Sequence, residues 1–450
     1  MPGTPASINH PVETNSNPIP APPRAARVAI PLALAIVSLA YLAQIPTPLR
    51  LITDGIDYLL QASSAIDGHG FLSHGVHSMR PPGYPALIFL LAKAGIATSW
   101  AIVALNCALL GIGCWASYFL LRHSFAFSRE VAQLILLLTL LSFIVIRNAA
   151  YPLSDICFFG ASTSYLLVLM RAEPVSGSRR LWWLLFSLPL LVLCIELRTI
   201  GIALIPALLW ATIGGADGAM HLYPILRSHR FTTFALLSAV LVFGIVALFH
   251  SRYLQFNLPI FHARGFTRAI ATNIEFHSTE WGEMASNAPA SKLPRMLGLP
   301  LRIFGALAIV VCAVGIWTRR SRPDSLMLYV LALASIVLAY PWADTRLWLP
   351  VLPFLMAYVL TGLRRLIPRE TLRPLLVAYG FIFCVLGIAA LVFSTRLTYA
   401  GARFPDIYGD GNLRDAYRIA LRGETVENNN PIHKDALYLL RRYEWRVTRK

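Results

Sequence analysis

The stretch that decides the fold of this chain is residues 47–85, TPLRLITDGIDYLLQASSAIDGHGFLSHGVHSMRPPGYP. Apolar segments long enough to cross a bilayer flank it, and the stretch itself carries Arg50, Asp54, Asp57 and Arg80. Ionisable side chains next to membrane spans are costly unless they pair or line a wet cavity, and they often mark a functional site. We therefore expect the rest of the chain to be a scaffold that holds this loop at the bilayer surface.

The composition predicts a polytopic membrane protein. Of the 450 residues, 56% are apolar and only 14% are charged, and the mean hydropathy is +0.61, whereas a soluble domain has roughly a quarter charged residues. The apolar runs are continuous over about 17 to 22 residues, as membrane helices require, while the strands of a barrel would alternate over about 10 residues. The expected fold class is therefore all-α.

The net charge of +17 comes mainly from short arginine clusters between the apolar runs. Such clusters orient membrane proteins, so the charge indicates a lipid bilayer as partner and no nucleic acid. The six cysteines lie inside apolar runs without CxxC spacing, which predicts neither disulfides nor a metal framework. Residues 1–27 are expected to be a disordered cytoplasmic tail without a cleavable signal peptide.

The alternation of apolar runs and charge predicts about eleven spans. Their expected positions are 28–45, 99–121, 130–146, 156–170, two short spans within 181–213, 231–249, 297–317, 325–341, 347–363 and 374–393. With these spans, every arginine cluster falls on one side of the membrane, which the positive-inside rule identifies as cytoplasmic. The polar corners fall on the opposite side: 47–84, 147–155, 196–199, 250–296 and 342–346.

The outer segments are expected to contain surface helices and one long loop. Residues 54–67 predict a short amphipathic helix on the membrane surface, residues 84–95 are apolar but too short to span and predict a second surface helix, and residues 250–296 predict a long polar loop. Residues 28–393 then form the transmembrane domain, and residues 394–450 form an extracytoplasmic, basic, partly helical tail.

The ionisable residues near the outer span ends predict a single site. They are Asp54, Asp57, Arg80, Asp155, Glu196, Arg198, Asp344 and Arg346. Their shared side indicates a cavity rich in acids and arginines at the outer leaflet.

The motifs of the first loop resemble those of one family. Asp54-x-x-x-Tyr58, then Gly68-x-Gly70, then the run from Arg80 to Pro85 (RPPGYP) is similar to the first outer loop of GT-C-fold glycosyltransferases. Within that fold, the chain looks most like the bacterial protein O-mannosyltransferases and the lipid A aminoarabinose transferases.

Two later motifs extend the resemblance over roughly residues 28–393. Asp155 stands where the family tends to have an acid at the start of the fourth span, and Arg346 precedes a Pro-rich span, as it often does in the family. The tail after residue 394 matches no known part, and the larger soluble domains of the family are not evident.

The resemblance implies transfer of a sugar from a polyprenyl-phosphate donor, with inversion, at the outer face of a bacterial inner membrane. Such a reaction needs a base for the acceptor and cations for the departing phosphate. Asp54 is the candidate base and Asp155 the second catalytic acid. Candidate substrate-binding residues are Asp57, Tyr58, Arg80, Tyr84, Arg198 and Arg346. The acceptor (protein, lipid or glycan) stays open, and so does a divalent metal, because relatives differ on it.

Structural roles stand beside these assignments. Asp54 and Asp155 could cap their helices, Arg80 could hold the proline turn, and Tyr84 could anchor the membrane interface. Two further pairings could be purely structural: Glu196 with Arg198, and Asp344 with Arg346. The histidines follow no ligand spacing, and loop positions are favoured over metal binding for them: His69, His74, His77, His262 and His277.

Two other functions remain as alternatives. A transporter or flippase would place ionisable groups in broken helices near the membrane midplane and would have two repeated halves, and no repeated half is visible. A glycan polymerase or ligase would use a large outer loop such as 250–296, but the RPPGYP run argues against it.

Overall fold

The computed structural model describes residues 24–175, 177–213, 265–321, 323–409 and 411–447, together with the single positions 259 and 263. Within these ranges the regular secondary structure is helical apart from one hairpin of two short antiparallel strands, β1 (Leu72–Ser73) and β2 (Val76–His77). Residues 1–23 of the tail predicted over 1–27, the span at 231–249 and most of 250–264 lie outside the described residues, while residues 24–27 of that tail belong to the first helix.

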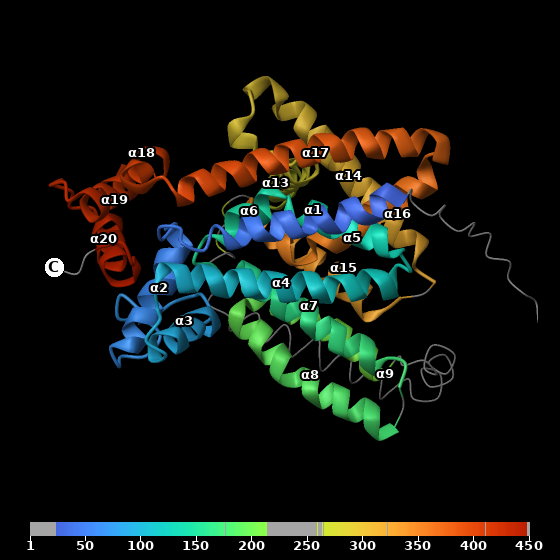
Figure 1. Cartoon of the computed structure of the whole chain (residues 1–450). Helices are drawn as coiled ribbons and strands as arrows, with labels where there is room; N and C mark the ends of the chain where they lie inside the picture. Colours follow the sequence, from blue (N-terminus) through green and yellow to red (C-terminus); the bar gives the residue numbers. More distant parts are fainter. Residues whose placement is uncertain are drawn as a thin grey trace, which may run out of the picture.

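Six helices of the described part are long and apolar enough to cross a bilayer. They are α4 (Ser99–Ser124), α7 (Ser154–Ala172), α8 (Gly177–Leu197), α14 (Gly298–Thr318, after the short 3₁₀ helix η3, Arg295–Leu297), α16 (Leu352–Leu366, after the 3₁₀ helix η4, Thr345–Val351) and α17 (Arg369–Thr398). Several of them run side by side along the length of the molecule (Figure 1).

The remaining predicted spans are shorter or bent. α5 (Arg129–Leu140) and α6 (Phe143–Ala149) meet at 61° and pass the length criterion only as a pair. Four further apolar helices are shorter: α1 (Arg24–Leu42), α3 (Gly83–Lys93), η1 with α9 (Thr199–Leu204, Ile205–Ile213) and α15 (Ser325–Leu338). The all-α membrane fold is therefore confirmed, whereas the number of eleven spans stays a prediction.

The break predicted within residues 181–213 is present. α8 ends at Leu197, Arg198 is extended with φ −153° and ψ 133°, and η1 begins at Thr199. The first of the two segments is longer than expected, because α8 already begins at Gly177.

The segment predicted as a long polar loop contains helix α13 (Phe266–Ser286), followed by the short 3₁₀ helix η2 (Ala290–Lys292). Four large buried side chains of α13, His277, Glu280, Trp281 and Met284, follow the i, i+3, i+4, i+7 spacing of one helix face, and Ser278 beside them is also buried. Because His277 and Glu280 are ionisable, the buried face of this helix does not show as a periodic pattern of apolar residues in the sequence. Their burial is possible because His277 Nδ1 and Glu280 Oε2 bond to each other at 2.8 Å.

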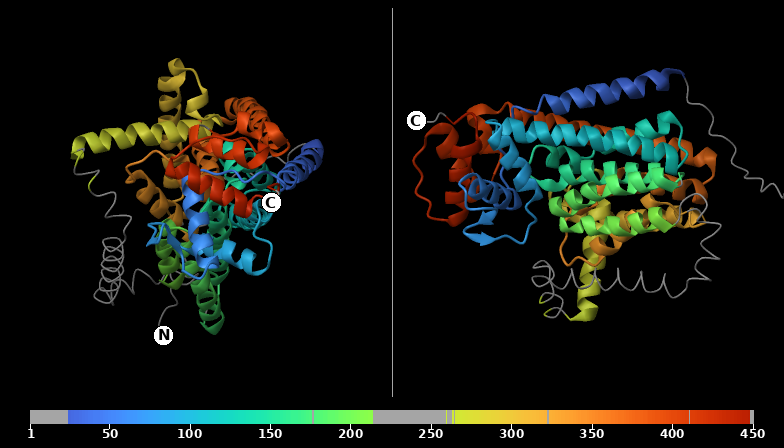
Figure 2. Two further views of the ribbon diagram at one scale, coloured as in Figure 1. Left: turned by 90° about the vertical axis from the view of Figure 1, so that its left-hand side faces the viewer. Right: turned by 90° about the horizontal axis from the view of Figure 1, so that it is seen from below.

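The first loop and the chain end form one compact layer at one end of the bundle (Figures 1 and 2). The loop contributes α2 (Thr53–Ile66), the hairpin and α3. The chain end contributes η5 (Gly401–Arg403), α18 (Phe404–Ile407), α19 (Gly411–Arg422) and α20 (Pro431–Tyr443). Both surface helices exist as predicted, but Ile56 and Leu59 on the apolar face of α2 are buried in protein. The expected C-terminal tail is thus a helical unit that covers the loop.

Two of the described arginine clusters, at 319–322 and 364–373, contact the segment after α4 at the other end of the bundle. Arg319, after α14, stacks over Phe125 with 4.5 Å to the ring centroid, and Arg364, in the last turn of α16, lies 5.3 Å from the ring of Phe127. The helices leading there pack tightly, since a side chain at Gly362 of α16 would strike the backbone of α14, a crossing typical of small residues in membranes. These two clusters between spans lie at the end of the bundle away from the first loop, as the positive-inside pattern predicts.

Candidate active site

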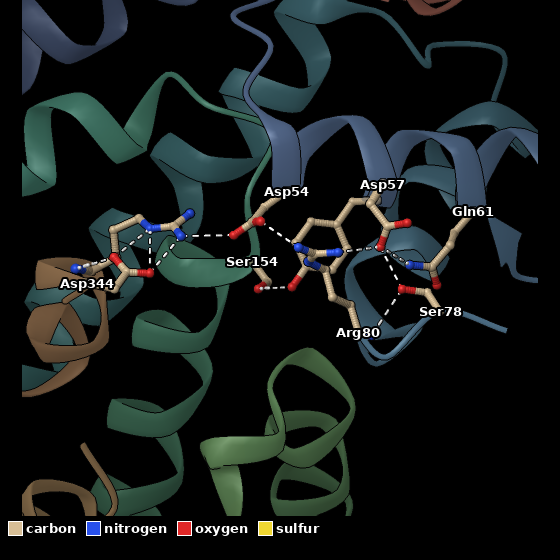
Figure 3. Close-up of polar contacts among 9 residues, drawn as sticks. Asp54, Asp57, Gln61, Ser78, Arg80, Ser154 and Asp344 are labelled. Atoms are coloured by element: carbon tan, nitrogen blue, oxygen red, sulfur yellow. Dashed lines mark hydrogen bonds and ion pairs between the residues drawn. The ribbon is translucent and has the colours of Figure 1, made fainter. Parts of the chain in front are cut away.

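Asp54 lies in the first turn of α2 between two guanidinium groups (Figure 3). Arg80 Nη2 donates to Asp54 Oδ1 at 2.5 Å, and Arg346 Nη2 donates to Asp54 Oδ2 at 2.9 Å. The helix N-cap is Ile52, without a side-chain cap bond, so the capping role considered for Asp54 is not what holds it. Its carboxylate instead connects α2 to the segment that carries Arg346, 292 residues later in the chain. Its position in the first turn of α2 also suits an anion, because the helix dipole is positive there.

Arg80 bridges the two acids of α2. Its Nη1 donates to Asp57 Oδ2 at 2.9 Å, so one guanidinium binds both Asp54 and Asp57. The same Asp57 oxygen accepts from Ser78 Oγ at 2.6 Å and from Gln61 Nε2 at 3.2 Å. Arg80 therefore does more than hold the proline turn, because it determines how the loop 78–82 sits against α2 (Figure 3).

Arg346 is held from its other side by Asp344. Its Nε and Nη2 donate to the Asp344 carboxylate at 2.9 and 2.7 Å, the two-pronged geometry that makes such pairs strong. The 3₁₀ helix that carries them is anchored to α13, where Glu280 accepts from Trp348 Nε1 at 2.9 Å. Arg346 thus makes the structural pair with Asp344 and also reaches Asp54.

The RPPGYP run is shaped by close packing on α8. A Cβ added to Gly83 would strike the backbone carbonyl of Glu196 and lie 2.8 Å from the backbone nitrogen of Leu197, so no other residue fits there without displacement. Tyr84 is fully buried and packs edge-to-face on Tyr58 at 5.4 Å. It supports the wall of the site and does not anchor the membrane interface.

A second ion pair lies beside the first cluster. Asp155, in the first turn of α7 and 2% exposed, pairs with Arg198 Nη1, directly after α8. Arg198 thus pairs with Asp155 rather than with the exposed Glu196, and Asp155 makes no cap bond. A 3.0 Å hydrogen bond between Tyr58 OH of α2 and Ser154 Oγ, the residue before Asp155, connects this ion pair to α2.

The charges shift the ionisation of the α2 side chains. Burial raises the pKa of Asp54, but the positive charges of Arg346 and Arg80 outweigh burial and hold the pKa below its usual value. The pKa of Asp57 is also lowered, since hydrogen bonds and the charge of Arg80 exceed the effect of burial. Burial raises the pKa of Tyr58 despite the nearby positive charges. The site therefore holds ionised carboxylates and a neutral phenol at neutral pH.

A cavity of about 350 Å³ adjoins the Arg346 corner. Its lining residues are Glu275, Phe276, Thr279, Glu280, Glu283, Arg302, Ala343 and Thr345. In the described part of the chain, no three His, Cys, Asp or Glu side chains are placed to hold a metal ion together.

The structure adds residues that the sequence-based site did not include. Ser78, Gln61 and Ser154 hydrogen-bond to predicted site residues. Glu280 of α13 accepts a hydrogen bond from Trp348, in the 3₁₀ helix that carries Arg346. Short polar residues next to predicted acids, such as Ser154 beside Asp155, are the only signal that could have pointed to them. Nothing in the sequence pattern of α13 connects it with the loop.

No known family model matches the sequence, and no curated protein matches it. Among solved structures, ArnT from Cupriavidus metallidurans in the apo state aligns with a TM-score of 0.51 and 15% sequence identity, over 93% of this chain and 85% of that chain. The ArnT structure bound to undecaprenyl phosphate aligns with a TM-score of 0.50 and 15% identity, over 92% and 85%. ArnT is a lipid A aminoarabinose transferase. This chain is therefore a multi-pass membrane protein with the GT-C fold of membrane glycosyltransferases.

Proposed function

We propose that the protein is a glycosyltransferase that moves a sugar from a polyprenyl-phosphate donor to an acceptor, with inversion at the anomeric carbon. The observation that carries the proposal is the position of Asp54 between Arg80 and Arg346. A carboxylate able to take a proton thus lies within hydrogen-bond reach of two groups able to bind a phosphate. Those are the two functions that the reaction needs at one place.

The donor phosphate is bound by guanidinium groups. Arginine matches two phosphate oxygens at once and stays charged at any physiological pH. Arg80 and Arg346 lie at the outer end of the bundle, where the lipid tail of a donor would enter from the bilayer. The fold's similarity to a protein that binds undecaprenyl phosphate supports a donor of this class.

The charge balance of the cluster suggests how the base is activated. Three carboxylates (Asp54, Asp57 and Asp344) face two guanidinium groups (Arg80 and Arg346), which gives a net charge of −1. While both arginines bind Asp54, its low pKa makes it a weak base. A phosphate that takes over either arginine removes that stabilisation and raises the pKa of Asp54 toward the range of a useful base.

In the reaction, the acceptor oxygen attacks the anomeric carbon from the face opposite the phosphate. The carbon–oxygen bond to the phosphate breaks, its electron pair stays on the phosphate, and Asp54 takes the acceptor proton. Protonated Asp54 no longer competes for Arg80 and Arg346, so the guanidinium N–H groups that bound Asp54 can stabilise the leaving polyprenyl phosphate. One displacement of this kind inverts the configuration.

The remaining predicted residues act around this centre. Asp155 holds Arg198, which adds a third cation beside the site. Asp57 orients Arg80, and Tyr58 and Tyr84 form the wall between the two ion-pair clusters. By the positive-inside rule, the end of the bundle that carries this site faces the periplasm or exterior of a bacterial inner membrane.

The positions of the ionisable residues favour transfer over transport. Asp54 and Asp155 lie in the first turns of their helices, Arg198 lies in the break between α8 and η1, and Arg346 lies in η4 before α16. A transporter would place most such groups at helix breaks near the membrane midplane, whereas the two acids lie at helix starts.

The test uses the purified protein in liposomes with a panel of undecaprenyl-phosphate monosaccharides that covers hexoses, pentoses and amino sugars. Mass spectrometry of the lipid fraction measures undecaprenyl phosphate released in the presence of an envelope extract as acceptor. Release that depends on both the protein and the extract supports transfer. Movement of an intact donor between leaflets without release would show a flippase instead.

A further inference from the structure

Residues 46–51 lead from the first membrane helix to α2 without regular structure. This approach segment contains no helix or strand, and Thr47, Leu49, Arg50 and Leu51 are all buried. Buried backbone polar groups outside helices and strands need hydrogen-bond partners, which other parts of the chain must largely supply.

Side chains of the C-terminal unit supply most of these partners. Tyr417 OH accepts from the Leu51 nitrogen at 2.8 Å and donates to the Leu49 carbonyl oxygen at 2.6 Å. Tyr408 OH donates to the Leu51 carbonyl at 2.8 Å, and Glu444 Oε2 accepts from the Leu49 nitrogen at 2.5 Å. Leu49 and Leu51 therefore have both backbone polar groups satisfied by residues more than 350 positions away.

The same unit binds the backbone just before this point and the far end of α2. Arg446 donates to the carbonyl oxygen of Pro46, and Tyr443 OH hydrogen-bonds to Ser63 Oγ at 3.0 Å. The exposed Arg442–Asp67 pair at the rim is screened by water and adds little.

We propose that Tyr417, with Tyr408 and Glu444, positions Asp54, so that the C-terminal unit is part of the catalytic machinery rather than an appendage. Asp54 follows Leu51 by three residues, and the bonds to Leu49 and Leu51 determine where α2 begins. The proposal rests on the proposed function, since Asp54 is the base there. The hydrogen bonds of these three residues go to the backbone of Leu49 and Leu51, so they act on Asp54 through the backbone.

The experiment uses the full chain with Tyr417→Phe. This change removes one hydroxyl and keeps the ring, which packs on Phe404 at 5.1 Å and on Tyr408 at 5.7 Å. Tyr438→Phe is the matched control, because that tyrosine is on α20, is 42% exposed and pairs with Arg442 at the rim. Two quantities are measured: hydrogen exchange of peptides covering residues 46–58, and kcat and KM with the undecaprenyl-phosphate sugar that the wild type uses.

Tyr417→Phe should speed exchange in residues 46–58 and lower kcat by about 10- to 100-fold, the scale expected when reacting groups are misplaced by about 1 Å. The KM for the donor should stay within about twofold, and Tyr438→Phe should match the wild type. Faster exchange with an unchanged kcat would refute the positioning role, and so would unchanged exchange. If the wild type shows no transfer, the proposed function fails while the exchange result still reports on the contact.

Glu444 gives an independent check in case Tyr417→Phe does not fold. Glu444→Gln keeps an oxygen that accepts from the Leu49 nitrogen, whereas Glu444→Leu removes it. We expect the glutamine variant to retain most of the kcat and the slow exchange of residues 46–58, and the leucine variant to lose both. Equal kcat in the two variants would overturn the proposal.

Discussion

Asp54→Asn should abolish most of the transfer while the protein stays folded. Asparagine has nearly the same shape as aspartate but takes no proton at neutral pH, so the change removes the base and leaves the packing. A general base contributes about 10²- to 10⁴-fold to a rate, which corresponds to about 2.7–5.5 kcal/mol of activation free energy.

The cost in stability should be smaller, and the structure gives the reason. Asp54 accepts from Arg80 and Arg346, but each arginine keeps a second acid, Asp57 and Asp344 respectively. The asparagine oxygen can still accept from one of them. The loss is then one charge-assisted hydrogen bond between groups that are 30% exposed or less, or about 2 kcal/mol, and the melting temperature should fall by only several degrees.

The assay measures undecaprenyl phosphate released from the active donor, together with thermal unfolding in detergent. Asp67→Asn is the matched control: it is the same chemical change just past the end of α2, in an exposed pair with Arg442, and should leave the rate within about twofold. Asp57→Asn weakens only the positioning of Arg80 and should reduce the rate less than Asp54→Asn. Transfer by Asp54→Asn within about threefold of the wild type, or a larger loss for Asp57→Asn, would refute the assignment of the base.

Four further predictions rest on the contacts in and around the site. Both neighbouring arginines hold the pKa of Asp54 below its usual value in the free protein, so the acidic limb of the pH profile of kcat/KM should lie below about pH 4. The acidic limb of kcat should lie at higher pH, because the bound phosphate then occupies one of the arginines. If the two limbs coincide, the phosphate does not replace Asp54 as a partner of an arginine. The same depressed pKa means that Asp54 stabilises the fold above its unfolded pKa and that this contribution is lost as pH falls through the folded value, which melting temperatures across that range would measure. Gly83→Ala should destabilise by about 1–3 kcal/mol, since the new methyl group lies 2.8 Å from the nitrogen of Leu197, and an unchanged melting temperature would contradict that packing. Arg198→Ala should cost about 3–5 kcal/mol by leaving buried Asp155 unpaired, and adding Asp155→Asn should restore stability but not transfer.

Much of the fold was predictable because the membrane imposes simple rules. The low charge content and the long apolar runs determined the all-α membrane class, since backbone groups in lipid must be satisfied within helices. The arginine clusters determined which ends of the helices lie together. The break before Thr199 followed from the polar residues around Arg198.

The site was predicted in part, for the same local reasons. The RPPGYP run and the acids near span ends identified Asp54, Arg80, Asp155 and Arg346 as candidates. In the structure, Asp54 binds both Arg80 and Arg346.

The partners of these residues depended on the tertiary structure. That Arg346 reaches Asp54, that Asp155 binds Arg198 and that Tyr417 satisfies the backbone of Leu51 are contacts between segments 43 to 366 residues apart. Local patterns in a sequence report which residue types an element needs on each face. They do not report which distant side chain satisfies a buried charge or a bare backbone, because that depends on how the helices pack.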